Sequence, residues 1–111
     1  MSYTKVVKPW GMTPTKQDFE VADLQASSND AQEIDFEGAQ ELNVEFETAC
    51  KVAMAATAAA AATKISAGKY WTGETATGKA LYKESRGVWV LNDADSIATG
   101  GLRISRYWYS V

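Results

Sequence analysis

Residues Thr48 to Ala67 read TACKVAMAATAAAAATKISA, and no other stretch of the chain has so decided a pattern. Alanine has the highest intrinsic helix propensity because it loses no side-chain entropy when the chain becomes ordered. Gly68 follows directly, where helices commonly end on a residue in the left-handed conformation. The stretch therefore predicts a helix over Thr48 to Ala67.

The predicted helix is small and apolar on every side. On a helical wheel one stripe holds Ala49, Ala53, Ala56 and Ala60, and the opposite side holds Met54, Ala55, Ala58 and Ala62. Such a helix offers water almost no polar face, so most of its surface has to be covered. We expect the cover to come from the same chain or from other copies of it, with Ala56 and Ala60 in the contact.

Length and composition indicate one folded domain. The chain has 111 residues, 46% of them apolar, with four Trp, five Tyr and three Phe, which is enough apolar area to offset the entropy lost on ordering. The single cysteine, Cys50, excludes an intrachain disulfide and is expected to be a small buried thiol. The absence of histidine excludes a Ser-His triad and a His-based metal site.

The formal net charge of −3 conceals three blocks of different sign. Residues 1–16 hold three lysines and no acid, residues 17–47 hold ten acids and no base, and residues 48–111 hold eight bases and four acids. Ten uncompensated carboxylates repel one another unless cations lie nearby. We weigh a solvated acidic face, association with basic segments of another copy, and capture of a basic partner.

The first sixteen residues predict an extended N-terminal arm. Pro9, Gly11 and Pro14 disfavour regular structure, although Tyr3 to Lys8 alternates weakly as a strand does. Trp10 is expected either to pack on its own core or to anchor in a pocket of a neighbouring copy.

Two features bear on location. The first residues lack the run of about 7 to 15 apolar residues that a secretory signal needs. The apolar run Val52 to Ala62 would span about 16 Å as a helix, against about 30 Å for the apolar core of a bilayer. We expect a soluble product that is cytoplasmic on synthesis, with the virion as a further location and no membrane partner.

Alternating apolar and acidic residues predict a β-hairpin over Glu33 to Glu47, with a turn around Gly38. The core face carries Ile34, Phe36, Leu42, Val44 and Phe46, and the outward face carries Glu33, Asp35, Glu37, Glu41, Glu45 and Glu47. Like charges opposite one another across strands are destabilising, so this face calls for cations or a basic partner. One long helix from Asp30 onward is the rival interpretation.

The other segments predict a helix or strand over Thr15 to Gln25, a loop at 26–30, and then antiparallel strands. These strands are Lys69–Thr72, Lys79–Lys83, Val88–Leu91, Ile97–Thr99 and Leu102–Tyr109, with loops at 84–87 and 92–96 and a tight turn at Gly100-Gly101. The predicted fold class is α+β, with one Ala-rich helix packed on a small antiparallel sheet. An extended arm over residues 1–16 precedes a single domain over residues 17–111.

Three motifs for chemistry are incomplete. Gly73 to Lys79 matches the start of a phosphate-binding P-loop, but Ala80 replaces the required hydroxyl and a strand is predicted to follow. Asp93-Ala94-Asp95 resembles the opening of a calcium loop that lacks its glycine and final glutamate. Glu45 and Glu47 share a strand face with no pocket to raise a carboxyl pKa. We expect no enzyme activity, no cofactor and no metal.

These features favour a structural, non-enzymatic subunit of a homo-oligomeric assembly of the virion-shell, decoration or filament type. The arm would add a strand to a neighbour's sheet, and the acidic segment would meet the basic region of another copy or a second structural protein. The expected interface residues are Tyr3, Val6, Trp10, Glu41, Glu45, Glu47, Ala56, Ala60, Arg103, Arg106 and Trp108.

Two alternatives stay open. The C-terminal residues Arg103, Arg106, Tyr107, Trp108 and Tyr109 combine cations with stackable rings, as binding modules for nucleic acid or carbohydrate do. The carboxylates from Asp18 to Glu47 would instead suit an inhibitor that mimics nucleic acid and captures a basic protein.

Overall fold

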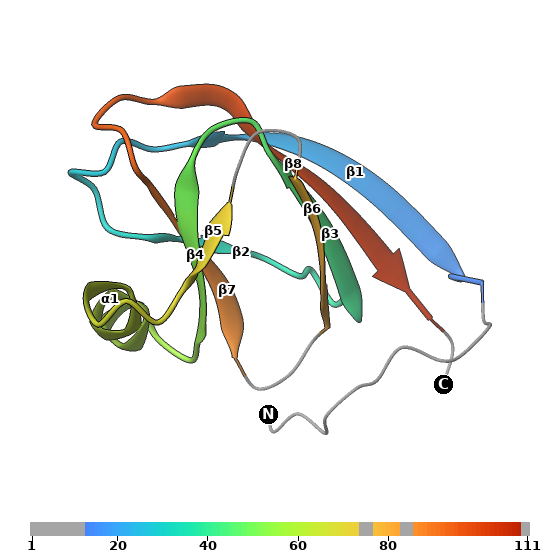
Figure 1. The fold of residues 1–111 in the computed structure, drawn as a ribbon. Coiled ribbons are helices and arrows are strands. Elements are labelled where there is room, and N and C mark those ends of the chain that lie inside the picture. The colour runs from blue at the N-terminus through green and yellow to red at the C-terminus, as the bar shows by residue number, and fades with distance from the viewer. Residues whose placement is uncertain (1–12, 74–76, 83–85, 110–111) are drawn as a thin grey trace.

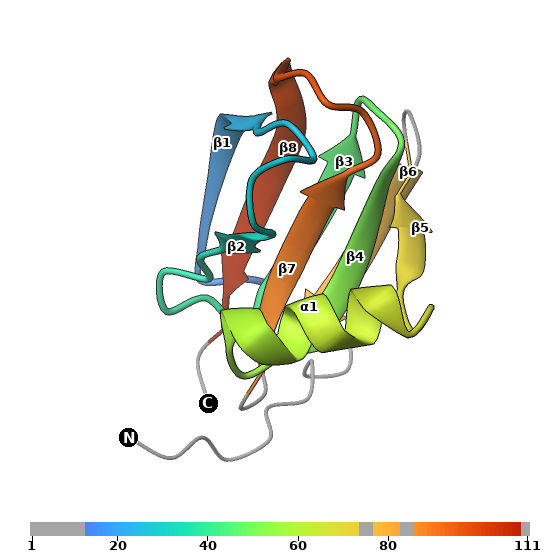
Figure 2. The ribbon, with the colours of Figure 1, turned by 90° about the vertical axis from the view of Figure 1, so that its left-hand side faces the viewer.

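The computed structural model describes residues 13–73, 77–82 and 86–109. These residues form β1 (Lys16–Leu24), β2 (Gln32–Ile34), β3 (Glu41–Phe46), β4 (Cys50–Ala55), α1 (Ala58–Ser66), β5 (Trp71–Gly73), β6 (Thr77–Tyr82), β7 (Gly87–Asn92) and β8 (Ala98–Trp108). Antiparallel pairing of these strands gives two sheets, sheet A with the order β1-β8-β3-β6 and sheet B with the order β2-β7-β4-β5. The sheets face each other, and α1 crosses the outer face of sheet B (Figure 1, Figure 2).

Period-two alternation builds the core between the sheets. β3 of sheet A turns Leu42, Val44 and Phe46 inward, and β7 of sheet B turns Val88 and Val90 toward them. Successive side chains of a strand point to opposite faces, so each of these strands has one buried face. The coarse prediction of an α+β chain fits, although the described residues are mostly antiparallel sheet.

The helix is shorter than the sequence predicts. Residues Cys50–Ala55 form β4, whose side chains Cys50, Val52 and Met54 are buried. β4 pairs with β7 along its whole length and with β5 over its first half. Helix propensity differs by less than about 1 kcal/mol per residue, so pairing and burial outweigh the preference of alanine for a helix.

Thr57 sets the start of α1. Its side-chain oxygen accepts a hydrogen bond from the Ala60 amide at 3.2 Å, which satisfies an amide that has no partner within the helix. Gly68 follows the helix with a φ of 77°, as its position in the sequence predicts. Ala61 is fully buried where α1 packs on β4, whereas Ala60 is half-buried and Ala56 is exposed.

Strands β2 and β3 do not form the predicted hairpin. β2 pairs with β7 in sheet B, whereas β3 pairs with β6 and β8 in sheet A. The chain crosses between the sheets at Glu37 and Gly38, whose φ angles of 51° and 83° make the turn. Ile34 and Phe36 are buried as predicted, because alternation fixes which face is buried and leaves the partner strand open.

The predicted tight turn at Gly100-Gly101 is wrong, because both glycines lie inside the long strand β8. Gly100 has a φ of 65°, and the register of β8 against β1 shifts between Ala22 and Leu24. The Gly100 amide donates a hydrogen bond to Asp23 Oδ1 at 2.8 Å. The glycine pair therefore forms a bulge that bends a continuous strand.

The segment Thr15 to Gln25, which fitted a helix or a strand, contains β1. Lys16, the last residue of the predicted arm, is the first residue of this strand. Most of the predicted arm, including Tyr3, Val6 and Trp10, lies outside the described residues.

The strands after α1 lie close to their predicted positions. The bounds of β5, β6 and β7 differ by one or two residues from the prediction. The predicted loop at 92–96 is held by Asn92, whose amide nitrogen donates to the Ser96 carbonyl at 2.8 Å and whose oxygen accepts from the Ala94 amide at 2.9 Å. Turn chemistry therefore predicts this loop correctly.

Candidate functional site

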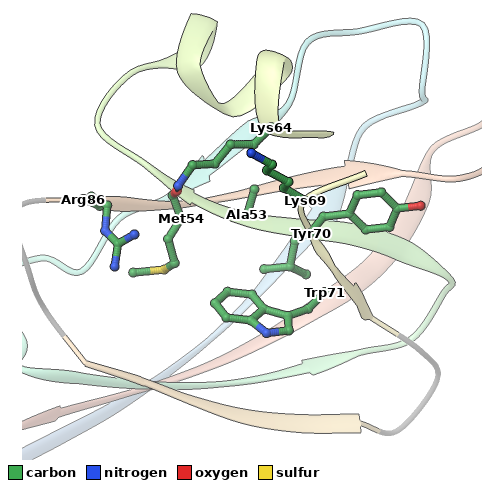
Figure 3. Close-up of a pocket in the computed structure, with 8 residues that line it drawn as sticks. Ala53, Met54, Lys64, Lys69, Tyr70, Trp71 and Arg86 are labelled. Atoms are coloured by element: carbon green, nitrogen blue, oxygen red, sulfur yellow. The ribbon is translucent and has the colours of Figure 1, made fainter. Parts of the chain in front are cut away.

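A groove lies where β5 stops covering β4. β5 pairs with Cys50, Lys51 and Val52 only, so the rest of β4 has β7 as its neighbour on one side and, among the described strands, none on the other. The groove has a volume of about 360 Å³. Its described lining consists of Val52, Ala53, Met54, Lys64, Lys69, Tyr70, Trp71 and Arg86 (Figure 3).

Three cations converge on this surface, which we call the basic groove. Lys64 lies in the last turn of α1 and donates a hydrogen bond from Nζ to the Met54 carbonyl at 2.6 Å. Lys69 follows the helix, and Arg86 precedes β7, so the cations come from two separate parts of the chain. Of the described lining residues three are basic and none is acidic.

Two aromatic side chains border the basic groove. Tyr70 and Trp71 remain 37% and 43% exposed, and Figure 3 shows the Tyr70 ring turned away from Arg86 and Met54. Lys51 Nζ lies 5.7 Å from the centre of the Tyr70 ring and 2.7 Å from Asp93 Oδ1. The hydrogen bond to Asp93 raises the pKa of Lys51, so this lysine stays charged beside the ring.

The opposite edge of the sandwich is acidic. β1 and β2 end their sheets on the side away from β5 and β6 (Figure 2). A smaller cavity of about 190 Å³ lies there between the sheets, and carboxylates from β1, β2 and the following loop gather around it. We call this surface the acidic edge and define it by Asp18, Glu20, Glu33, Asp35 and Glu37.

Arg106 is a buried cation that forms ion pairs with carboxylates of the acidic edge. It is only 3% exposed, and its Nη1 lies 2.8 Å from Glu20, 3.4 Å from Glu37 and 3.8 Å from Asp18. Its Nε donates to the Asp35 carbonyl at 2.8 Å. The acidic edge thus holds five carboxylates, three of them within 4 Å of its one buried guanidinium, so the surface keeps a negative charge.

β1 also exposes two large apolar side chains. Phe19 is 62% and Val21 is 54% exposed, and alternation places both on the outer face of sheet A, opposite to the face that holds Glu20. Within the described part of the chain, β1 pairs with β8 alone, so its other side is a free edge. Exposed apolar groups on a free edge strand are a typical site of association with another chain.

The predicted interface residues do not gather on one surface. Glu41, expected on the outward face, is buried, and the hydroxyl of Tyr109, the residue after β8, donates to its Oε1 at 2.5 Å. Glu45 is exposed and stands opposite Arg103, which lies 3.2 Å from Glu47. Part of the predicted charge complementarity is therefore met within the chain.

The predicted C-terminal platform is also dispersed. Arg106 is buried and Arg103 is exposed, because residues three apart on β8 point to opposite faces, and Tyr109 is buried directly after the strand. Trp108 is half-buried, with Lys16 Nζ 4.5 Å from the centre of its ring. These residues do not present a shared stacking surface.

The sequence alone does not predict the basic groove. Lys64, Lys69, Tyr70 and Trp71 lie close together in the sequence, and this cluster of cations and rings is the signal that could have found them. Arg86 is separated from them by more than a strand, so no spacing connects it to the groove.

The incomplete motifs gain no support from the fold. Gly73 ends β5, part of the P-loop match lies outside the described residues, and strand β6 follows where a P-loop needs a helix. In the described ranges no group of three or more cysteine or carboxylate side chains is arranged to hold a metal ion.

Comparison of the chain with protein-family models, curated proteins and solved structures finds no match. No helix in the part of the chain that the structure describes has the length and apolar content that crossing a membrane requires.

Proposed function

We propose that this protein is a structural, non-enzymatic subunit of a homo-oligomeric assembly, of the virion-shell, decoration or filament type. Its copies are held together by the N-terminal arm and by contacts between surfaces of opposite charge. The observation that carries the proposal is the edge of β1 that no other described strand covers, with Phe19 and Val21 exposed on it.

The negative charge of β1 determines which extended segments can pair with its edge. An edge strand offers unpaired backbone groups to any extended segment. Pairing of β1 with β1 of another copy would bring acidic side chains such as Asp18 and Glu20 together, which is destabilising. The segment before β1 carries Lys5 and Lys8 and no acid, so the arm of another copy has the complementary charge.

Sedimentation velocity at rising protein concentration tests this proposal. We expect the chain of 12.0 kDa to form species of higher mass. The double substitution Phe19→Ser/Val21→Ser should weaken association at least about tenfold, since burial of each large apolar side chain contributes on the order of 1.5 kcal/mol or more.

Ile97→Ser is the matched control, because Ile97 is 56% exposed but belongs to the segment before β8 and not to β1. It should leave the association constant unchanged. A wild-type chain that stays at the mass of one copy at every concentration would exclude the proposed function.

The basic groove favours a second candidate, a binding module for nucleic acid or another anionic ligand with rings. The groove has three cations and two partly exposed aromatic side chains. Proteins that bind single-stranded nucleic acid use cations to contact the phosphates and aromatic rings to stack on the bases. Titration with a labelled oligonucleotide at low and high salt tests it, and Lys69→Glu should reduce the affinity. No binding at low salt would remove this candidate.

A further inference from the structure

We propose that the basic groove of one copy receives the acidic edge of the next copy. This inference rests on the proposed homo-oligomeric function and names the two surfaces that meet. The partner is therefore a second copy of this chain, and the contact is an ion-paired one.

The two surfaces lie at opposite edges of the same sandwich. The acidic edge belongs to β1 and β2, whereas the basic groove lies beside β5 and the end of α1 (Figure 2). When two identical chains pair through two different surfaces, one copy keeps an unused basic groove and the other keeps an unused acidic edge. Further copies can then add at both ends, which gives a ring if the rotation closes and a filament if it does not.

The charges of the two surfaces are complementary. The basic groove carries Lys64, Lys69 and Arg86 with no acid among its described lining residues. At the acidic edge, Arg106 lies within 4 Å of three carboxylates but forms no ion pair with Glu33 within the described part of the chain. Glu33 is exposed and its carboxylate lies against Gly87 of β7, so Arg106 does not neutralise its charge.

Contacts between like surfaces are disfavoured by the same charges. Two acidic edges would place up to five carboxylates against five others, and two basic grooves would oppose three cations to three. Like charges brought together at an interface cost several kcal/mol. Contact between a basic groove and an acidic edge is therefore favoured over contact between two like surfaces.

Two variants of matched charge change test the inference. The edge variant, Glu33→Lys/Asp35→Asn, adds three positive charges and keeps a side-chain oxygen at position 35 to accept the hydrogen bond from the Glu37 amide, which is 2.8 Å long in the wild type. The groove variant, Lys64→Gln/Lys69→Glu, removes three and keeps a side-chain donor near the Met54 carbonyl. Each variant alone should associate at least about tenfold more weakly than the wild type, as measured by sedimentation at low salt.

Mixing the two variants is the decisive step. In an equimolar mixture, the unchanged edge of the groove variant meets the unchanged groove of the edge variant, so each mixed pair has one wild-type contact and carries the two altered surfaces at its ends. We expect the mixture to form mixed pairs with an affinity within about threefold of the wild-type contact, to stop at pairs, and to dissociate as salt is added.

Glu45→Lys is the control for net charge, because Glu45 is exposed on the outer face of sheet A and belongs to neither surface. It should associate as the wild type does. Circular dichroism checks that every variant keeps its strand content before the masses are compared.

Each remaining outcome contradicts the inference. If the wild type associates and both folded variants associate equally well, the proposed function survives and this contact is wrong. If only the groove variant is weakened, or if the mixture stays dissociated, another acidic segment fills the groove. A monomeric wild type would instead remove the proposed function itself.

Discussion

At the residue scale, Arg106 shows how a buried cation organises an acidic surface. Its side chain is covered on the inner face of β8, yet its partners Glu20 and Glu37 keep about half of their surface in water. A buried charge that loses its partners is costly, and carboxylates that lose their cation repel one another. The sequence places Arg106 in an aromatic strand and gives no sign of this burial.

Substitution of Arg106 by methionine tests its structural role. We expect Arg106→Met to lower the free energy of unfolding by about 2 to 4 kcal/mol, because the carboxylates around it lose their counter-charge. Urea unfolding measures the change. Arg103→Met on the same strand is the control and should cost less than about 1 kcal/mol, since its ion pair with Glu47 is exposed. Equal losses in the two variants would contradict this role.

The thiol of Cys50 makes stability depend on alkaline pH. Burial, followed by the charge of Asp93, raises the pKa of this thiol from 9.0 to about 12. Between these values the unfolded chain loses the thiol proton and the folded chain keeps it, so stability falls as pH rises above 9.0.

We therefore expect the wild type to lose unfolding free energy faster than Cys50→Ala above pH 9.0, by up to about 1.4 kcal/mol per pH unit. Urea unfolding at several pH values gives both slopes, and other titrating groups cancel in the comparison. Parallel slopes for the two proteins would show that Cys50 does not titrate on unfolding.

At the scale of the element, local pattern predicts which residues are buried better than it predicts their partners. Ile34, Phe36 and the inward residues of β3 are buried as their alternation requires, but β2 and β3 lie in different sheets. The alanine-rich stretch predicts a helix that is too long, because helix propensity reflects only the local sequence. In the fold, β4 forms backbone hydrogen bonds with strands on both sides, β5 and β7. The basic groove needs β5, α1 and Arg86 together, so it becomes visible only in the fold.

Ala61 tests the contact between α1 and sheet B. Ala61→Leu should lower the free energy of unfolding by about 1 to 3 kcal/mol, because the fully buried methyl group leaves no space for a larger side chain. Ala62→Leu is the control, since Ala62 is exposed on the same helix and should change stability by less than about 0.5 kcal/mol. A neutral Ala61→Leu in urea unfolding would mean that the helix does not pack closely on β4.

At the scale of the whole molecule, the fold separates the charges that the sequence arranges in blocks. Carboxylates of the acidic segment lie around Arg106 at the edge formed by β1 and β2. The cations of the basic groove, which lie in or after α1 and just before β7, are beside β5. Association of opposite edges follows from this separation as our proposal, with the free edge of β1 as a further contact.

The most direct test joins the two surfaces covalently. Chains labelled with heavy nitrogen are mixed with unlabelled chains and treated with a carbodiimide, which links amines to carboxylates without a spacer. We expect links between Lys69 of one copy and Glu33 or Asp35 of another, identified as mixed-isotope peptides by mass spectrometry. An assembly whose mixed-isotope links never join these surfaces would contradict it.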